Sequence, residues 1–155
     1  MNYETSAEIE IAIAHHFGVL KCIIIPNLNG MFYYELDLCI LSKALYAAEV
    51  EIKISKGDLK RDAKKHHCHD WNFDFIKSLW FAMPDKMKGC EEFVPEKAGI
   101  LFVSTKGKVM EFRKPKINTA AKKWPVEKAL ALARLGMIRM WNLKHNEMTR
   151  YHNQK

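Results

Sequence analysis

Two carboxylates and one lysine interrupt a pair of apolar segments that have the character of neighbouring strands. Asp37 lies in LDLCIL, Glu51 and Lys53 lie in AEVEIKI, and residues 42–44 between them can form the turn of an antiparallel pair. Because side chains alternate along a strand, Glu49 shares the face of Glu51 and Lys53, while the intervening apolar residues share the opposite face. The sequence therefore predicts a group of acids and one lysine on one face of two adjacent strands.

This combination is what a metal-dependent phosphodiester hydrolase requires. Two carboxylates can bind a divalent cation, and a lysine beside them can stabilise charge that develops on the phosphate oxygens. The alternative is a cross-strand ion pair on a half-exposed face, which would contribute at most about 1 kcal/mol. The apolar flanks favour burial, where an unpaired charge is costly and where a metal ion would keep the carboxylates ionised. Both interpretations remain open from the pattern alone.

The remaining segments predict a single mixed α/β domain. Thr5 and Glu8 form a T-x-x-E capping box before a run in which Ile9, Ile13 and Phe17 recur at helical spacing. Expected helices cover 5–17, 58–67 and 126–141, and expected strands cover 19–25, 32–41, 45–54, 78–84, 99–104 and 109–112, the last two as a hairpin. We expect one domain over residues 1–155, with a core of about 5–112 and a basic C-terminal helix within about 120–150.

The last expected helix carries its own apolar pattern. Leu130, Ala133, Met137 and Trp141 recur at spacings of three and four residues, so they should share one side of the helix. Core packing is the favoured role for the tryptophans, and base stacking is the alternative. The sets expected in the core are Trp71, Trp124 and Trp141, and Met83, Met87, Met110, Met137 and Met140.

The composition indicates an intracellular domain with a core. The chain is 48% apolar, and it contains no run of 18 or more apolar residues that could span a membrane. The N-terminus lacks the layout of a secretory signal, and the four cysteines lack the short paired spacings of a disulfide framework. We therefore expect a cytoplasmic protein with reduced thiols and no membrane partner.

The charges are distributed unevenly along the chain. Residues 1–104 contain 12 Lys or Arg and 15 Asp or Glu, whereas residues 105–155 contain 13 and 3, within a total net charge of +7. A strongly basic final third favours a polyanionic partner, most often nucleic acid, because neutralising phosphates releases their counterions. The alternative is solubility charge on a small protein.

Several short motifs follow the Glu-x-Lys strand in a specific order. They are E-h-K-x-S, D-x-x-x-D-x-K, [YF]FA[VM]P and VP-x-x-AG[IL], where h is apolar. In this chain the first motif is Glu51, Lys53 and Ser55, and the second is Asp58, Asp62 and Lys64. The third covers residues 81–84 and the fourth covers residues 94–100. Over about residues 5–115 the chain resembles the MmcB-like DNA-repair branch of the PD-(D/E)xK nuclease superfamily. Leu36 stands where the proline of the superfamily name would be.

The resemblance implies a restriction-endonuclease-like α-β-β-β-α-β core that hydrolyses DNA with Mg²⁺ or Mn²⁺. Asp37, Glu51 and the Ile52 carbonyl would bind the metal, and Lys53 would orient water or stabilise the transition state. Many members add a glutamate from the first helix. We favour Glu10 for this role because Glu8 already serves the capping box. Supporting roles fall to Glu49, Ser55, Asp58, Asp62 and Lys64; no residue is assigned to an organic cofactor, and a homodimer is plausible for this superfamily.

The basic residues expected to contact DNA lie after the site and in the final third. Solvated surface charge is the alternative for each of them. The leading hypothesis is a DNA-repair or DNA-processing nuclease, and the second is a non-catalytic DNA-binding accessory protein that keeps the nuclease fold. The DNA-contact set is Lys56, Lys60, Arg61, Lys64, Arg113, Lys114, Lys116, Lys122 and Lys123.

Overall fold

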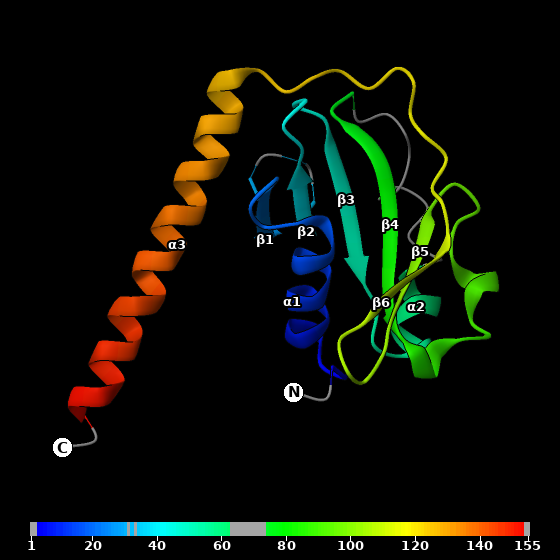
Figure 1. Cartoon of the computed structure of the whole chain (residues 1–155), viewed down its shortest axis with the longest axis horizontal. Coiled ribbons are helices and arrows are strands. Elements are labelled where there is room, and N and C mark those ends of the chain that lie inside the picture. The colour runs from blue at the N-terminus through cyan, green and yellow to red at the C-terminus, as the bar shows by residue number, and fades with distance from the viewer. Residues whose placement is uncertain (1–2, 31, 33, 63–73, 154–155) are drawn as a thin grey trace.

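A computed structural model describes residues 3–30, 32, 34–62 and 74–153 of the chain. Six strands form one mixed sheet in sequential order, and three α-helices and two short 3₁₀ turns surround it (Figure 1). The elements are α1 (Ser6–Phe17), β1 (Ile23–Leu28), β2 (Leu36–Leu41), β3 (Ala47–Ile52), α2 (Lys56–Asp62), β4 (Ile76–Pro84), η1 (Asp85–Met87), η2 (Glu91–Phe93), β5 (Gly99–Val103), β6 (Val109–Arg113) and α3 (Val126–Asn153). The expected mixed α/β architecture is confirmed.

The direction of the strands changes at the centre of the sheet. β1, β2 and β3 form an antiparallel meander, β4 and β5 run parallel to β3, and β6 is antiparallel to β5. The parallel step from β3 to β4 needs a crossover, and α2 lies in that connection. β3 is therefore paired on both edges, which makes it an interior strand of the sheet.

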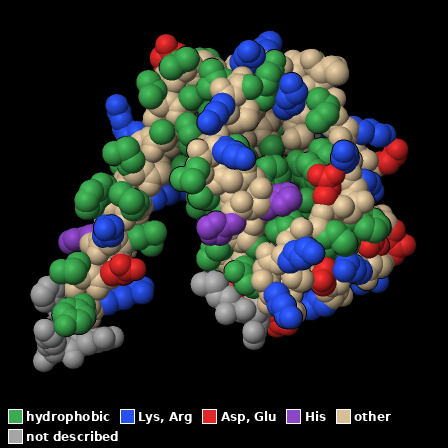
Figure 2. Space-filling model, viewed as in Figure 1, with side chains coloured by type: hydrophobic (Ala, Val, Ile, Leu, Met, Phe, Trp, Pro, Cys, Tyr) green, Lys and Arg blue, Asp and Glu red, His purple; other side chains and the backbone are tan. Residues whose placement is uncertain are grey.

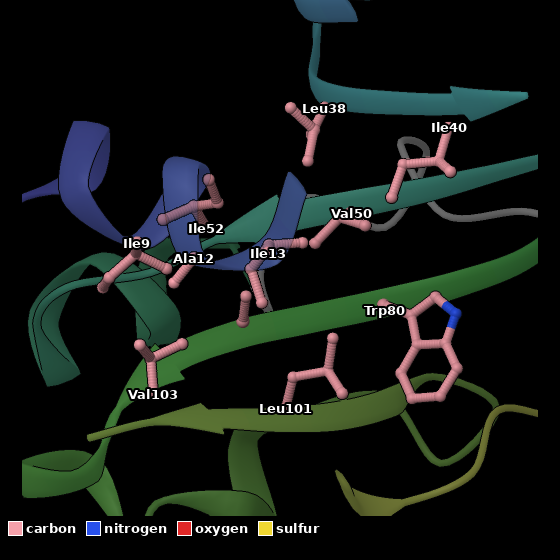
Figure 3. Close-up of a cluster of buried hydrophobic side chains, with 11 residues drawn as sticks. Ile9, Ala12, Ile13, Leu38, Ile40, Val50, Ile52, Trp80, Leu101 and Val103 are labelled. Atoms are coloured by element: carbon pink, nitrogen blue, oxygen red, sulfur yellow. The ribbon is translucent and has the colours of Figure 1, made fainter. Parts of the chain in front are cut away.

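The first helix covers one face of the sheet because its apolar side is matched to that face. Thr5 caps the helix: its hydroxyl oxygen accepts a hydrogen bond from Glu8 N, and the Glu8 carboxylate accepts one from Thr5 N. Ile9 and Ile13 are fully buried on α1. They pack with alternate residues of four strands, among them Leu38, Ile40, Val50, Ile52, Trp80, Leu101 and Val103 (Figure 3).

The opposite face carries two apolar clusters. The first packs under α3 and Trp124 and includes Leu28, Leu36, Cys39, Leu41, Ala129 and Leu132. The second packs under α2 and includes Leu59, Leu79, Phe81, Met83, Ile100 and Phe102. Glu49 and Glu51 project to this face between the two clusters, since Glu49 pairs with Cys39 on β2 and with Leu79 on β4.

The first strand differs from the expected 19–25. α1 ends at Phe17, Gly18 adopts a positive φ of 92°, and Val19 and Leu20 are exposed in the turn that follows. β1 therefore starts at Ile23 and continues through Pro26 to Leu28, beyond the expected end at residue 25. Proline is tolerated there because β1 is an edge strand and its missing N–H removes no bond that the sheet requires.

The expected buried side of the last helix is wrong. Leu130, Met137 and Trp141 are 64%, 59% and 60% exposed, whereas Ala129 and Leu132 are buried against the sheet. The side that packs combines Leu132 with the small residues Ala129 and Gly136, because the helix lies so close to β1 that a Cβ on Gly136 would stand 2.8 Å from the side chain of Ile25. α3 also extends well beyond 141, to Asn153.

The expectation that the other tryptophans and methionines lie in the core is confirmed only in part. Trp124 is buried, as are Met83 and Met87, so core packing is confirmed for these three. Met110 and Met140 are 42% and 44% exposed, so their assignment to the core is wrong. Trp71 and Cys68 lie outside the described residues. The described cysteines, Cys22, Cys39 and Cys90, are free thiols, and no described helix has the length and apolar character to cross a bilayer.

Gly99 provides a test of the packing between β4 and β5. A Cβ at this position would lie 2.4 Å from Trp80 Cε3 and 2.9 Å from Pro115 Cδ. We expect Gly99→Ala to lower the free energy of unfolding by about 1–3 kcal/mol, because both contacts belong to packed groups. Thermal unfolding measures the change.

Gly57→Ala is the matched control, since Gly57 is in α2 and a Cβ there would meet only Ser55 Oγ at 4.0 Å. This variant should be neutral or slightly stabilising because alanine favours helix. Equal melting temperatures for the two variants would contradict the packing described at Gly99.

Candidate active site

The two predicted acids meet where β2 begins and β3 ends. Leu38 pairs with Val50 in the antiparallel ladder, so Asp37 and Glu51 are the next residues along each strand. Asp37 Oδ2 accepts a hydrogen bond from Ile52 N at 2.8 Å. The Asp37 carboxylate therefore closes the end of the β2–β3 ladder and is held beside the backbone that separates Glu51 from Lys53.

Glu51 and Lys53 form a buried ion pair. Lys53 Nζ lies 2.7 Å from Glu51 Oε2, and both side chains are 8% exposed. Lys53 Nζ also lies 6.0 Å from the centroid of the Phe81 ring, on the apolar cluster beneath α2. Removing two charges from water is expensive, and only a close hydrogen-bonded pair offsets that cost. The lysine is thus fixed next to one of the two acids, as the Glu-x-Lys spacing predicted.

Glu49 is a further acid on the same strand face. Tyr34 donates its hydroxyl hydrogen to Glu49 Oε2 at 2.8 Å, while Oε1 is buried and receives no hydrogen bond from the described residues. Burial, followed by the charge of Glu51, raises the pKa of Glu49 to about 8, and Asp37 adds to the rise. A pKa of about 8 favours the protonated form of Glu49 at neutral pH, and this form relieves the repulsion between its carboxyl group and that of Glu51.

The acid on the first helix that couples to this group is Glu10. Burial raises the pKa of Glu10, the charge of Asp37 raises it further, and the charge of Arg139 opposes the rise. Glu8, by contrast, is occupied in the capping box with Thr5. The charges of Asp37 and of Arg139 on α3 thus both act on Glu10. Arg139 is held at the end of β1, where it donates to the carbonyls of Pro26 and Asn27.

The oxygen donors suit Mg²⁺ or Mn²⁺, but they do not form a closed cage. Among the described residues, no three His, Cys, Asp or Glu side chains are placed together to hold a metal ion. Mg²⁺ commonly uses only one or two protein carboxylates and completes its shell with water and substrate phosphate. Asp37, Glu51 and the Ile52 carbonyl meet that smaller requirement. The buried Oε1 atom of Glu49 has no hydrogen-bond partner among the described residues.

The residues expected to support the site have structural roles or lie outside the description. Ser55 Oγ accepts from Asp58 N at 3.1 Å and thereby caps α2, and Asp58 lies 3.7 Å from the guanidinium of Arg61. These contacts explain Ser55 and Asp58 without reference to a ligand. The side chain of Asp62 and the whole of Lys64 lie outside the described residues.

The expected DNA-contact residues near the site are Lys56 and Lys60. Both ammonium groups lie over the Phe93 ring, at 5.2 and 4.8 Å from its centroid. Arg61 is exposed on the same helix. All three cations lie on α2, three to eight residues after Lys53 in the chain.

The expected contacts of the final third are spread over the surface. Arg113 donates to the carbonyls of Ala98 and Pro95 and is held in the fold. Lys116 and Lys122 form exposed ion pairs with Glu96 and Asp74. Lys114 is exposed. Lys123 Nζ lies 5.7 Å from the centroid of Tyr46, at the end of β3 away from Glu51.

Two residues of this site carried no usable signal in the sequence. The expected strand over 32–41 included Tyr34, but β2 starts at Leu36 and Tyr34 lies in the irregular segment before it. Strand alternation therefore does not indicate that its hydroxyl reaches Glu49. Arg139 lies in a long basic helix among several other cations, and only the packing of α3 along β1 brings it near Glu10.

A structural comparison identifies a protein with the same fold. The solved structure of a protein of unknown function from Silicibacter pomeroyi matches with a TM-score of 0.68 at 17% identity, covering 95% of this chain and 94% of that chain. At this identity the likeness shows the shared fold. No protein-family model and no curated protein matches the sequence.

The pKa of Glu49 leads to a prediction for the pH dependence of stability. Its value of about 8 lies above the ordinary 4.5, so the native state favours the protonated form. This contribution is complete below about pH 4.5 and is lost as the pH rises to about 8. Between about pH 6 and pH 9 the free energy of unfolding should fall by about 2–3 kcal/mol from this group, since one pKa unit corresponds to about 1.4 kcal/mol.

Urea unfolding of the wild type and of Glu49→Gln over this range measures the effect. Glutamine keeps an oxygen for Tyr34 and does not ionise, so its profile should be flatter by that amount. Glu35→Gln, which alters an exposed glutamate, should follow the wild type. Parallel profiles for all three proteins would show that Glu49 does not titrate in this range.

Proposed function

We propose that this protein is a metal-dependent phosphodiester hydrolase acting on DNA, in repair or processing. The observation that carries the proposal is the group of Asp37, Glu49, Glu51 and Lys53, in which three carboxyl groups and one ammonium lie on neighbouring positions of one largely apolar sheet face. A purely structural ion pair would need only Glu51 and Lys53. The additional acids raise the electrostatic cost of the fold, which is typical of sites retained for chemistry.

The sheet order supports a restriction-endonuclease-like core as part of this proposal. That core has a helix, an antiparallel meander of three strands, a crossover helix and a parallel fourth strand. Here α1, β1–β3, α2 and β4 follow the same order and directions. In this arrangement Asp37 is on the second strand, and Glu51 and Lys53 are at the end of the third.

In the proposed mechanism each side chain has a separate task. Asp37, Glu51 and the Ile52 carbonyl would hold a Mg²⁺ or Mn²⁺ ion, which when bound supplies Lewis acidity and a water of lowered pKa. The hydrogen bond from Ile52 N fixes the Asp37 carboxylate in position. Lys53, held by Glu51, presents a cation where negative charge develops on the phosphate. Tyr34 orients Glu49, and Glu10 approaches Asp37 from α1.

A surface that could receive the DNA backbone begins at the other end of β3. Lys77 and Lys123 place their ammonium groups 3.5 and 5.7 Å from the centroid of Tyr46, and neither has an acidic partner in the described part of the chain. Tyr46 precedes Glu51 by five residues, which is about 17 Å of strand. At an axial rise of about 3.4 Å per nucleotide, this distance corresponds to about five nucleotides.

The second candidate is a non-catalytic DNA-binding accessory protein with the same fold. The observation that favours it is that Asp37 and Glu51 already have partners within the fold. Asp37 accepts from Ile52 N, Glu51 is paired with Lys53, and no three-ligand group is formed by the described residues. In that case DNA binding would use the cations alone and would not need a metal.

Cleavage assays separate the two candidates. Single-stranded, nicked, flapped and branched DNA are incubated with the protein and Mg²⁺ or Mn²⁺. We expect the wild type to cut, and Asp37→Asn to cut about 10²–10³-fold more slowly because it loses a metal-binding charge while keeping an acceptor for Ile52 N. Lys53→Met should show a comparable loss, and Glu35→Gln should cut like the wild type.

Thermal unfolding of each variant accompanies the assay, because removing Lys53 leaves the buried Glu51 charge without its partner. Lys53→Arg, which keeps the charge but not the geometry, is the second variant at this position. Cleavage that continues unchanged in Asp37→Asn and in both Lys53 variants would refute the assignment of the site. Metal-independent binding without cleavage of any substrate would favour the accessory protein.

Salt-dependent DNA binding tests the surface around Tyr46. We expect the double variant Lys77→Ala/Lys123→Ala to bind a labelled duplex more weakly and to lower the slope of log K against log salt by about 1–2, because each phosphate contact contributes about 0.9. Lys86→Ala, an exposed lysine on η1, is the control. An unchanged slope in the double variant would remove this surface from the proposal. Fluorescence anisotropy over a range of salt concentrations provides the measurement.

A further inference from the structure

The outward side of α3 carries large apolar residues that no other part of the described structure covers. Leu130, Met137, Trp141 and Met148 are 64%, 59%, 60% and 58% exposed. Figure 2 shows hydrophobic side chains exposed along this helix. A patch of this kind on a soluble domain marks an interaction site, because single exposed apolar residues are ordinary but an aligned series is not.

These four residues lie on one narrow stripe of the helix. Their spacings are 7, 4 and 7 residues, and seven residues make nearly two helical turns while four make slightly more than one. The side that packs on the sheet is different, since it is formed by Ala129, Leu132, Gly136 and Arg139. The stripe is thus left over after α3 has satisfied its contacts with its own domain.

The second half of α3 makes little use of its own domain. Every residue from 140 to 150 is exposed, and the polar anchor of the helix is Arg139, which donates to Asn27 O at 2.9 Å. An isolated helical segment of this length is marginal in water, because most helical stability in proteins comes from packing an apolar face. A long apolar-striped helix that extends past its last anchor is stabilised when a partner covers the stripe.

The order of the spacings points to a particular partner. The series 7-4-7 reads the same in both directions, with its midpoint at residue 139. A two-fold axis at that midpoint, perpendicular to the helix, would set Leu130 against Met148 of a second copy and Met137 against Trp141. An isologous interface requires this self-complementarity, whereas a different partner protein would not.

The available area is adequate for such a pair. A buried aromatic side chain removes about 150–250 Å² from water, so half-exposed residues of this size offer roughly 100 Å² each. Together with Val126, which is 57% exposed and lies beside it, the stripe offers roughly 500 Å² per copy. Flanking atoms bring this near the roughly 800 Å² per partner of a standard interface.

We propose that the protein is a homodimer in which the α3 helices of two copies pack antiparallel through Leu130, Met137, Trp141 and Met148. This proposal is independent of the function proposed above, since none of the four residues belongs to the acid group or to the surface around Tyr46. The two copies would hold their sheets on either side of a two-helix seam.

Light scattering coupled to size-exclusion chromatography tests the state of the full chain. We expect a mass of twice 18.1 kDa for the wild type. Met137→Glu and Trp141→Glu should each shift the protein to 18.1 kDa while far-UV circular dichroism keeps its folded spectrum. Leu143→Glu is the matched control. Leu143 is 65% exposed on α3 but lies away from the stripe, beside Pro26 and Asn27, so this variant should stay dimeric.

Cysteine crosslinking tests the direction of the pairing. In the antiparallel register Leu130→Cys/Met148→Cys should form a covalent dimer on oxidation, with a 130–148 link identified by peptide mass spectrometry. Leu130→Cys alone should give no 130–130 link, because the two positions lie at opposite ends of the seam. A 130–130 link would overturn the antiparallel arrangement.

Three results would overturn the dimer itself. One is a monomeric wild type at micromolar concentrations. Another is a dimer that persists in both glutamate variants, which would assign the contact to another face. The third is a monomer whose binding to anionic vesicles or to single-stranded DNA is lost in Trp141→Glu, which would give the stripe to a polyanionic surface instead.

Discussion

The burial of charge on an interior strand is the constraint around which the rest of the sheet is arranged. Glu49, Glu51 and Lys53 are 3%, 6% and 7% exposed, on a strand that is paired on both of its edges. Charge in such a position destabilises the fold unless each group finds a partner. Lys53 supplies one to Glu51, and Tyr34 supplies one to Glu49. The repulsion that remains between the acids is relieved by protonation of Glu49, because burial and the neighbouring acids raise its pKa.

This constraint explains why the face is divided. An unbroken apolar layer over β3 would place Glu49 and Glu51 directly beneath hydrocarbon. Instead, one cluster gathers under α3 and another under α2, and the acids project between them. The uninterrupted core lies on the other face, where α1 covers Leu38, Ile40, Val50 and Ile52. The alternation of β3 therefore places apolar side chains alone on the face that α1 covers, and ionisable groups between two apolar clusters on the other face.

The sequence was informative where local rules decide the outcome. Strand alternation was enough to put Glu49, Glu51 and Lys53 on one face, and the capping box was enough to start α1 and to occupy Glu8. The mixed α/β order of the elements followed from the spacing of apolar runs. Boundaries were less certain, because the turn after Gly18 exposes Val19 and Leu20, whose types favour a strand.

The predictions failed where contacts between residues distant in the sequence determine which side chains are buried. An apolar series on a helix predicts which residues share a side, but not which side meets the sheet. In α3 the close approach to β1 selected Ala129 and Gly136, and the larger Leu130, Met137 and Trp141 were left outside. Tyr34 and Arg139 were missed for the same reason, since neither one's partner is indicated by its own segment.

The uneven charge of the sequence acquires a physical meaning in the fold. The acids concentrate before residue 104, and several cations of the final third lie near them: Lys122 pairs with Asp74, Lys116 pairs with Glu96, and the charge of Arg139 opposes the rise in the pKa of Glu10. Each such pair uses one charge of either sign, so pairing cannot consume the net +7, which must remain on the surface. Lys77 and Lys123 at Tyr46, and Lys56 and Lys60 at Phe93, are parts of that remainder. In the proposed function a polyanion that approaches the acids of β3 would meet like charge, and cations of this remainder would supply the attraction that offsets it.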